Sequence, residues 1–150
     1  MFVFDLSKKC IGKKKGKKMG TYKSVEEART YFVKDRFATD NGITLDDLSD
    51  EKSVCSMTIT ERHQNAYGGV MGGAIFTLAD FAFATIANQV HLSTVAQQVS
   101  INYLSAPKGK KLIATSSVKK NGRSSMVINV DVVDDTGRDI AQFVGTGFKL

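Results

Sequence analysis

The 150-residue sequence predicts an α+β fold in which an antiparallel sheet of five to six strands wraps around one long central helix. Apolar residues with helical spacing fill residues 68–88. Two segments with strand-like alternation precede this stretch, and four follow it. The regular alternation of strand and helix that builds a doubly wound parallel sheet is absent. A short N-terminal helix completes the predicted order.

The positive charge of the chain belongs to its first residues. Residues 1–18 hold seven Lys or Arg and one acidic residue, which gives +6 and leaves 14 basic and 14 acidic residues in the remainder. We therefore expect a disordered basic tail at 1–18, followed by a single domain at 19–150. Met19 is a plausible alternative start. A domain without net charge argues against nucleic acid as a partner.

Several features favour a cytoplasmic protein. The tail does not resemble a signal peptide. Asp80 with nearby Gly and Thr interrupts the longest apolar run, so we expect no run of the length of a membrane span and no membrane partner. Cys10 and Cys55 lack metal-ligand spacing and indicate reduced thiols. His63 and His91 form no paired motif with nearby acids, so we expect no metal site.

The first helix is predicted to begin after Ser24, which forms a capping-box-like pair with Glu27. We expect it to continue to about residue 37 and to end before the turn at Asn41-Gly42. Its predicted apolar side consists of Ala28, Tyr31, Phe32 and Phe37.

Six segments carry strand signals, most clearly where apolar and polar residues alternate. Turn residues separate them, and Asn121-Gly122 is the strongest hairpin signal in the chain. The predicted strands are 43–48, 53–60, 94–104, 111–119, 126–133 and 139–148.

The central helix is apolar on most of its circumference, so we expect it to be buried on several sides. Its apolar positions are Ala74, Ile75, Leu78, Ala79, Ala82, Phe83 and Ile86. Asp80 is the only charged residue in this stretch. Because an unpaired buried carboxylate is costly, Asp80 is either bonded structurally or used in chemistry.

Glycines at the start of this helix favour the chemical interpretation. Gly72 and Gly73 allow close approach of a ligand, and the first N–H groups of a helix have no intrahelical partner. Such donors suit a carbonyl oxygen that becomes negative during a reaction. Asp80 lies about 12 Å further along the axis, so one carbonyl cannot reach both ends. Two antiparallel copies of the helix would complete the site, which predicts a dimer.

The polar loop before the helix contains a second candidate. Asn65 can both donate and accept hydrogen bonds, so it could orient a water molecule or a thioester carbonyl. An Asx-type turn is an equally good interpretation of the same residue.

Together these residues resemble a known family. The stretch N-x-x-G-G-x-M-G-G-A-I-F-T-L-A-D-F-A-F-A, with the six strands, resembles the hotdog-fold acyl-CoA thioesterases and is closest to the phenylacetic-acid-degradation (4-hydroxybenzoyl-CoA thioesterase-like) subgroup. The resemblance covers residues 24–150. It implies a hotdog fold, hydrolysis of an acyl-CoA thioester and a homodimer with composite sites, assembled into a homotetramer. It implies no cofactor beyond the coenzyme A of the substrate.

The resemblance also assigns roles. Asp80 falls on the catalytic carboxylate, which acts as general base or nucleophile. Gly72 falls on the residue whose N–H binds the thioester oxygen, and Asn65 on the residue that positions water or the carbonyl. In the family, Asp80 faces Asn65 and Gly72 of the neighbouring subunit. Substrate contacts are expected at Gly73, Met71 and Thr77, and at the hairpin Gly122, Arg123 and Ser124, where relatives hold coenzyme A phosphates.

Two positions depart from the family pattern. Met71 stands where many members have His, and a thioether cannot transfer a proton. Ala84 stands where some members have a hydroxyl group. Thr77, one turn before Asp80, could replace that hydroxyl, although helical Thr more often bonds its own backbone.

The resulting hypothesis is an aryl- or medium-chain acyl-CoA thioesterase, with Phe76, Phe81 and Phe83 as an apolar wall that would serve equally well as core. One alternative is a non-catalytic acyl-CoA-binding module. The other is a hotdog dehydratase or hydratase, which would need a His with an acidic partner on the central helix.

Overall fold

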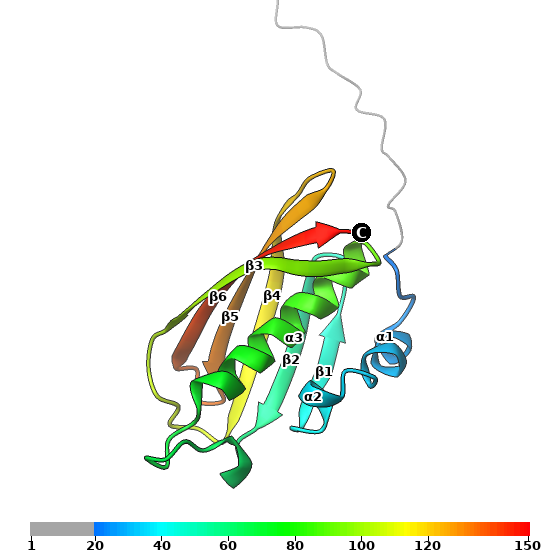
Figure 1. Cartoon of the computed structure of the whole chain (residues 1–150). Coiled ribbons are helices and arrows are strands. Elements are labelled where there is room, and N and C mark those ends of the chain that lie inside the picture. Colours follow the sequence, from blue (N-terminus) through cyan, green and yellow to red (C-terminus); the bar gives the residue numbers. More distant parts are fainter. Residues whose placement is uncertain (1–19) are drawn as a thin grey trace, which may run out of the picture.

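The computed structural model describes residues 20–150 as one curved sheet around a long helix (Figure 1). The expected disorder of residues 1–18 therefore lies outside the described residues. The helices are α1 (Val25–Phe32), α2 (Arg36–Thr39) and α3 (Gly72–Val90), with a 3-10 turn, η1 (Glu61–His63). The strands are β1 (Ile43–Leu48), β2 (Lys52–Thr58), β3 (Thr94–Tyr103), β4 (Lys111–Asn121), β5 (Ser125–Asp134) and β6 (Asp139–Lys149).

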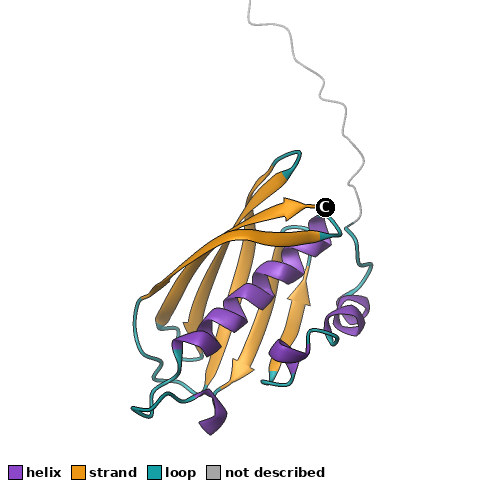
Figure 2. Cartoon of the chain, viewed as in Figure 1, coloured by secondary structure: helices purple, strands orange, loops and turns teal. Residues whose placement is uncertain are grey.

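All six strands belong to one antiparallel sheet, in the order β1-β2-β4-β5-β6-β3. Figure 2 shows α3 lying against one face of this sheet, with α1 beside β1 and α2 near the start of β1. The predicted α+β architecture is confirmed. Because β3 follows α3 but pairs only with β6, it forms one edge of the sheet, and β1 forms the other.

The core lies between α3 and the concave face of the sheet. Leu78, Ala82 and Ile86 are fully buried, and Phe83 packs on Phe143 of β6 with ring centroids 6.1 Å apart. A Cβ atom at Gly145 would lie only 2.6 Å from the Phe83 ring, so glycine on β6 lets the helix approach the sheet closely. The expected burial of the central helix is confirmed.

The expectation that no apolar run reaches the length of a membrane span was wrong. Helix α3, residues 72–90, is long and apolar enough to cross a membrane when judged by length and composition only. In the folded chain, however, most of this helix is buried inside the protein. The apolar composition of α3 is therefore explained by its place in the core.

The first helix is shorter than predicted. It begins as expected, because the Ser24 hydroxyl accepts a hydrogen bond from the Glu27 N–H at 3.2 Å, but it ends at Phe32. Phe32 and Ala38 are both buried, yet residues six apart lie about 120° apart around one straight helix. The break at residues 33–35 lets both residues face the core. It also leaves Phe37, predicted to lie on the apolar side of the first helix, 73% exposed.

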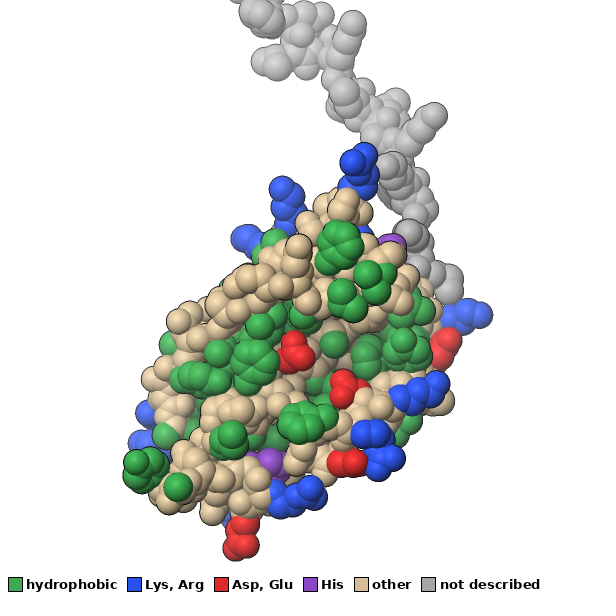
Figure 3. Space-filling model, in the orientation of Figure 1, with side chains coloured by type: hydrophobic (Ala, Val, Ile, Leu, Met, Phe, Trp, Pro, Cys, Tyr) green, Lys and Arg blue, Asp and Glu red, His purple; other side chains and the backbone are tan. Residues whose placement is uncertain are grey.

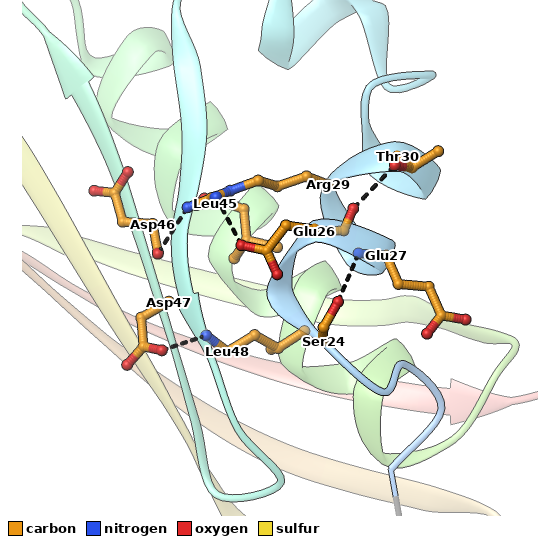
Figure 4. A network of polar contacts seen from close by, with 9 residues as sticks. All are labelled: Ser24, Glu26, Glu27, Arg29, Thr30, Leu45, Asp46, Asp47 and Leu48. Carbon is orange, nitrogen blue, oxygen red and sulfur yellow. Dashed lines mark hydrogen bonds and ion pairs between the residues drawn. The ribbon is translucent and has the colours of Figure 1, made fainter.

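Polar contacts attach α1 to the sheet (Figure 4). The Arg29 guanidinium donates from Nε to the Leu45 carbonyl at 2.7 Å and from Nη2 to the Asp46 carbonyl at 2.9 Å. These charge-assisted bonds join α1 to β1, beside the edge of the sheet where α2 approaches α3.

Candidate active site

The first turn of α3 presents free hydrogen-bond donors. Met71 is the N-cap, and its side chain makes no capping hydrogen bond. Its carbonyl accepts from the N–H groups of Ala74 at 3.0 Å and Ile75 at 3.4 Å. Within residues 20–150, the N–H groups of Gly72 and Gly73 donate to no protein acceptor. The helix therefore begins with two available donors at its positive end.

Tyr103, at the end of β3, contacts this turn. Its hydroxyl donates to the Gly72 carbonyl at 3.0 Å, and its ring lies 3.2 Å from the place that a Cβ atom of residue 72 would occupy. Gly72 thus has a packing reason to be glycine in addition to any role toward a ligand. Sequence reasoning identified Tyr103 only as a strand residue, because nothing in the linear pattern links it to a glycine 31 positions earlier.

Asn65 stabilises the loop that leads to α3. Its Oδ1 accepts from the N–H groups of Tyr67 at 2.9 Å and Gly69 at 3.1 Å, as in an Asx-type turn. Its Nδ2 donates to no group among the described residues. The turn interpretation of Asn65 therefore describes its oxygen, while its amide nitrogen remains available to a ligand or a second subunit.

Asp80 lies two turns along α3, half-buried beside a cavity of about 300 Å³. The cavity is lined by Asp35, Phe37, Ala38, Phe76, Thr77, Asp80 and Phe81. No donor within residues 20–150 bonds the Asp80 carboxylate. Burial raises the pKa of Asp80, and the negative charge of Asp35 raises it further. A carboxyl group with a raised pKa is a stronger base once ionised.

A second cavity, of about 320 Å³, lies beside the start of α3. Gly73, Met71 and Thr77 all line it, so the structure brings three predicted substrate-contact residues together. The Thr77 hydroxyl donates to the Gly73 carbonyl at 2.8 Å, which is the backbone bond typical of helical Thr. Sequence reasoning missed Phe37, which lines this cavity as well as that of Asp80.

The hairpin residues Gly122, Arg123 and Ser124 lie at the other end of the sheet. Lys149 Nζ donates to the Gly122 carbonyl at 2.7 Å, and Lys149 pairs with Thr94, which follows the C-terminal end of α3. One protomer therefore does not bring the hairpin to Gly72, and its predicted role would require another subunit.

His63 lines the second cavity, but both of its ring nitrogens are engaged in hydrogen bonds to the backbone. His63 is buried, its Nδ1 accepts from the Thr60 N–H at 3.0 Å and its Nε2 donates to the Asn41 carbonyl at 2.9 Å. Both ring nitrogens thus serve backbone contacts, which argues against the dehydratase alternative. Within residues 20–150, no group of three or more His, Cys, Asp or Glu side chains is arranged to hold a metal ion.

Comparison with known proteins identifies the family. Residues 67–141, half of the chain, match the thioesterase superfamily. The chain belongs to this superfamily. The predicted resemblance to hotdog-fold thioesterases is confirmed, and the chain is a thioester hydrolase of this fold.

Three relatives illustrate the similarity. Acyl-coenzyme A thioesterase PaaI of Escherichia coli is 28% identical over 131 residues, which cover 87% of this chain and 94% of PaaI. The structure of that E. coli protein, described as part of the phenylacetic acid degradation operon, superposes with a TM-score of 0.78 over 83% of this chain and 91% of PaaI. Human acyl-coenzyme A thioesterase 13 is 33% identical over 104 residues, covering 67% of this chain and 74% of its own. A hypothetical Streptococcus pneumoniae thioesterase crystallised with coenzyme A is 27% identical, with a TM-score of 0.72 over 78% of this chain and 94% of its own.

Proposed function

We propose that this thioesterase hydrolyses aryl- or medium-chain acyl-CoA to the free acid and coenzyme A. One observation carries the proposal: α3 begins with N–H groups at Gly72 and Gly73 that have no partner among residues 20–150, and it holds a half-buried carboxylate, Asp80, further along. These are the two groups that thioester hydrolysis requires. The names of PaaI and acyl-coenzyme A thioesterase 13, and the coenzyme A in the S. pneumoniae structure, support the choice of substrate.

The proposed reaction needs only water and the thioester. The Gly72 N–H binds the carbonyl oxygen while Asp80, acting as general base, accepts a proton from the water that attacks the carbonyl carbon. The oxygen carries the negative charge of the tetrahedral intermediate. When the carbon–sulfur bond breaks, coenzyme A leaves as a thiolate and takes up the proton from Asp80. Direct attack by the Asp80 carboxylate is the second possible route.

The proposed site is shared between two subunits. Gly72 and Asp80 lie about 12 Å apart along one helix, too far to act on one carbonyl. The exposed edge strand β3 supports a dimer, since only Thr94 is buried in this strand and Val95 is 46% exposed. Antiparallel pairing of two β3 strands would place two α3 helices side by side in opposite directions. Figure 3 shows this uncovered face of the molecule, where acidic side chains lie among hydrophobic ones.

The remaining assignments belong to the same proposal. Asn65 would position water or the carbonyl through its free Nδ2. Residues 122–124 of a neighbouring subunit would hold coenzyme A phosphates. A homotetramer built from two such dimers, a cytoplasmic location and the absence of a metal or redox cofactor complete it. The basic tail and the domain limit at residue 19 remain predictions.

A panel of aryl and straight-chain acyl-CoA esters tests this function, with release of free thiol as the readout. We expect turnover of an aryl or medium-chain ester well above the rates for the shortest and longest chains, since an apolar pocket discriminates by about tenfold or more per methylene. Binding of these esters without turnover would contradict the proposal and would identify an acyl-CoA-binding module instead.

A further inference from the structure

We propose that the acyl group of the substrate occupies the cavity between α2 and α3, and that Phe37 determines the length of acyl group that fits. This inference rests on the proposed thioesterase function and names the part of the protein that selects the substrate. Phe37 lies on the short helix α2, far in sequence from the glycines of α3, and no sequence motif assigns it a role.

The position of the cavity relative to the donors indicates its occupant. The cavity of about 320 Å³ is lined by Gly73 and Met71 at the start of α3. A thioester carbon held by the N–H groups there has two substituents, the acyl chain and the sulfur of the pantetheine arm. The arm contains two polar amides, whereas the cavity wall is mainly apolar and includes Ile43, Met57 and Phe76. Its polar members include Asn41, Arg62 and His63. Burial of apolar surface therefore favours the acyl chain in this cavity.

Phe37 lies at the limit of this space. Together with Phe76 and Thr77, it lines both this cavity and the cavity of about 300 Å³ beside Asp80, so the two cavities adjoin at these three side chains. Phe76 is packed against Phe143 with ring centroids 5.6 Å apart. Phe37 is 73% exposed and has no comparable packing. Of the two aromatic walls, Phe37 is the one that can be shortened without disturbing the core.

Hydrogen bonds from side chains to the backbone fix α2 in this place. The Asn41 side chain donates to the Phe37 carbonyl at 2.7 Å, and the Asn41 carbonyl accepts from buried His63 Nε2 at 2.9 Å. The His63 carbonyl in turn accepts from the Met71 N–H at 2.7 Å. This chain of hydrogen bonds joins the helix that carries Phe37 to the residue that begins α3. The wall and the donors are thus held at a defined separation.

Opposite substitutions test the proposal. Phe37→Ala removes the wall, and we expect kcat/KM for acyl chains longer than the wild-type optimum to rise about tenfold relative to the optimal chain. Ala74→Leu adds bulk inside the same cavity, and we expect the preference to move toward shorter chains. Val33→Ala is the matched control, because Val33 is an exposed apolar residue at the end of α1, just before α2, and lines neither cavity.

The outcomes separate this inference from the function on which it rests. Failure of the wild-type protein to hydrolyse any ester overturns the thioesterase proposal itself. Wild-type turnover with the same chain-length preference in Phe37→Ala and Ala74→Leu overturns the acyl pocket alone. An equal rise in KM for every ester also overturns it, because that result assigns the cavity to the pantetheine arm. Circular dichroism of each variant verifies that the fold is retained.

Discussion

Replacement of Asp80 by Asn is expected to lower kcat by about two orders of magnitude or more, with a much smaller change in KM. The amide keeps the size of the side chain but cannot accept a proton from water. Steady-state kinetics on the best ester of the panel measures the effect. An unchanged kcat would make Asp80 a structural residue and contradict the proposed mechanism.

The pH dependence of kcat/KM should report the ionisation of Asp80. Burial and the negative charge of Asp35 raise the pKa of Asp80. The apparent pKa on the acid side of the wild-type kcat/KM profile should therefore lie above 3.8, the ordinary value for Asp. Asp35→Asn is the matched control, since it removes the second carboxylate of the cavity. It should retain activity at neutral pH and move the acid side of the profile to lower pH.

Stability should change in the opposite direction from activity. A carboxyl group whose pKa is raised in the folded state stabilises the fold below its unfolded pKa, and this contribution is lost as the pH rises through the folded value. At neutral pH the ionised Asp80 therefore costs stability. The free energy of unfolding of Asp80→Asn at pH 7 should equal or exceed that of the wild type.

Replacement of Gly72 by Pro is expected to lower kcat by about 10²–10³, because it removes the N–H proposed to stabilise the oxyanion. The substitution suits the local backbone. Residue 72 is the first helical position, where Pro is tolerated, and Met71 before it has φ −65° and ψ 133°, an extended conformation compatible with a following Pro.

Gly72→Ala is the matched control. It adds a similar Cβ atom near the Tyr103 ring but keeps the N–H, so both variants require the ring to move by a few tenths of an ångström. We expect Gly72→Ala to retain most of the wild-type kcat. If Ala and Pro lower kcat equally, packing against Tyr103 accounts for the loss and the N–H is not an oxyanion donor.

The sequence was sufficient for most of the fold because the largest elements carry local signals. The apolar repeat of α3 and the alternation of the strands reflect burial that each segment shows by itself. The break after Phe32 carries no such signal. It arises because Phe32 and Ala38 both reach the core only when the helix is interrupted, which depends on the surface of α3 and β1.

The residues of the candidate site also differ in whether the sequence could predict them. Gly72 and Asp80 were predictable because helix ends and buried charges have known chemistry. Asp35, Phe37 and Tyr103 were not, because each meets α3 only through the tertiary fold. The Asn65 oxygen likewise shows its turn role only in the folded loop.

The central claim, that each site combines Gly72 of one subunit with Asp80 of another, is tested most directly by mixed dimers. Co-expression of Gly72→Pro and Asp80→Asn, each carrying a different affinity tag, yields heterodimers with one intact site and one doubly altered site. Wild-type chains mixed with the double variant provide the control, because every composite site of that heterodimer carries one lesion. Purification through both tags isolates each heterodimer.

The account predicts that the heterodimer of the two single variants recovers about half of the wild-type dimer activity, while the control heterodimer stays nearly inactive. The reverse pattern, with activity in the control and none in the heterodimer of single variants, would place each site within one subunit and contradict the account.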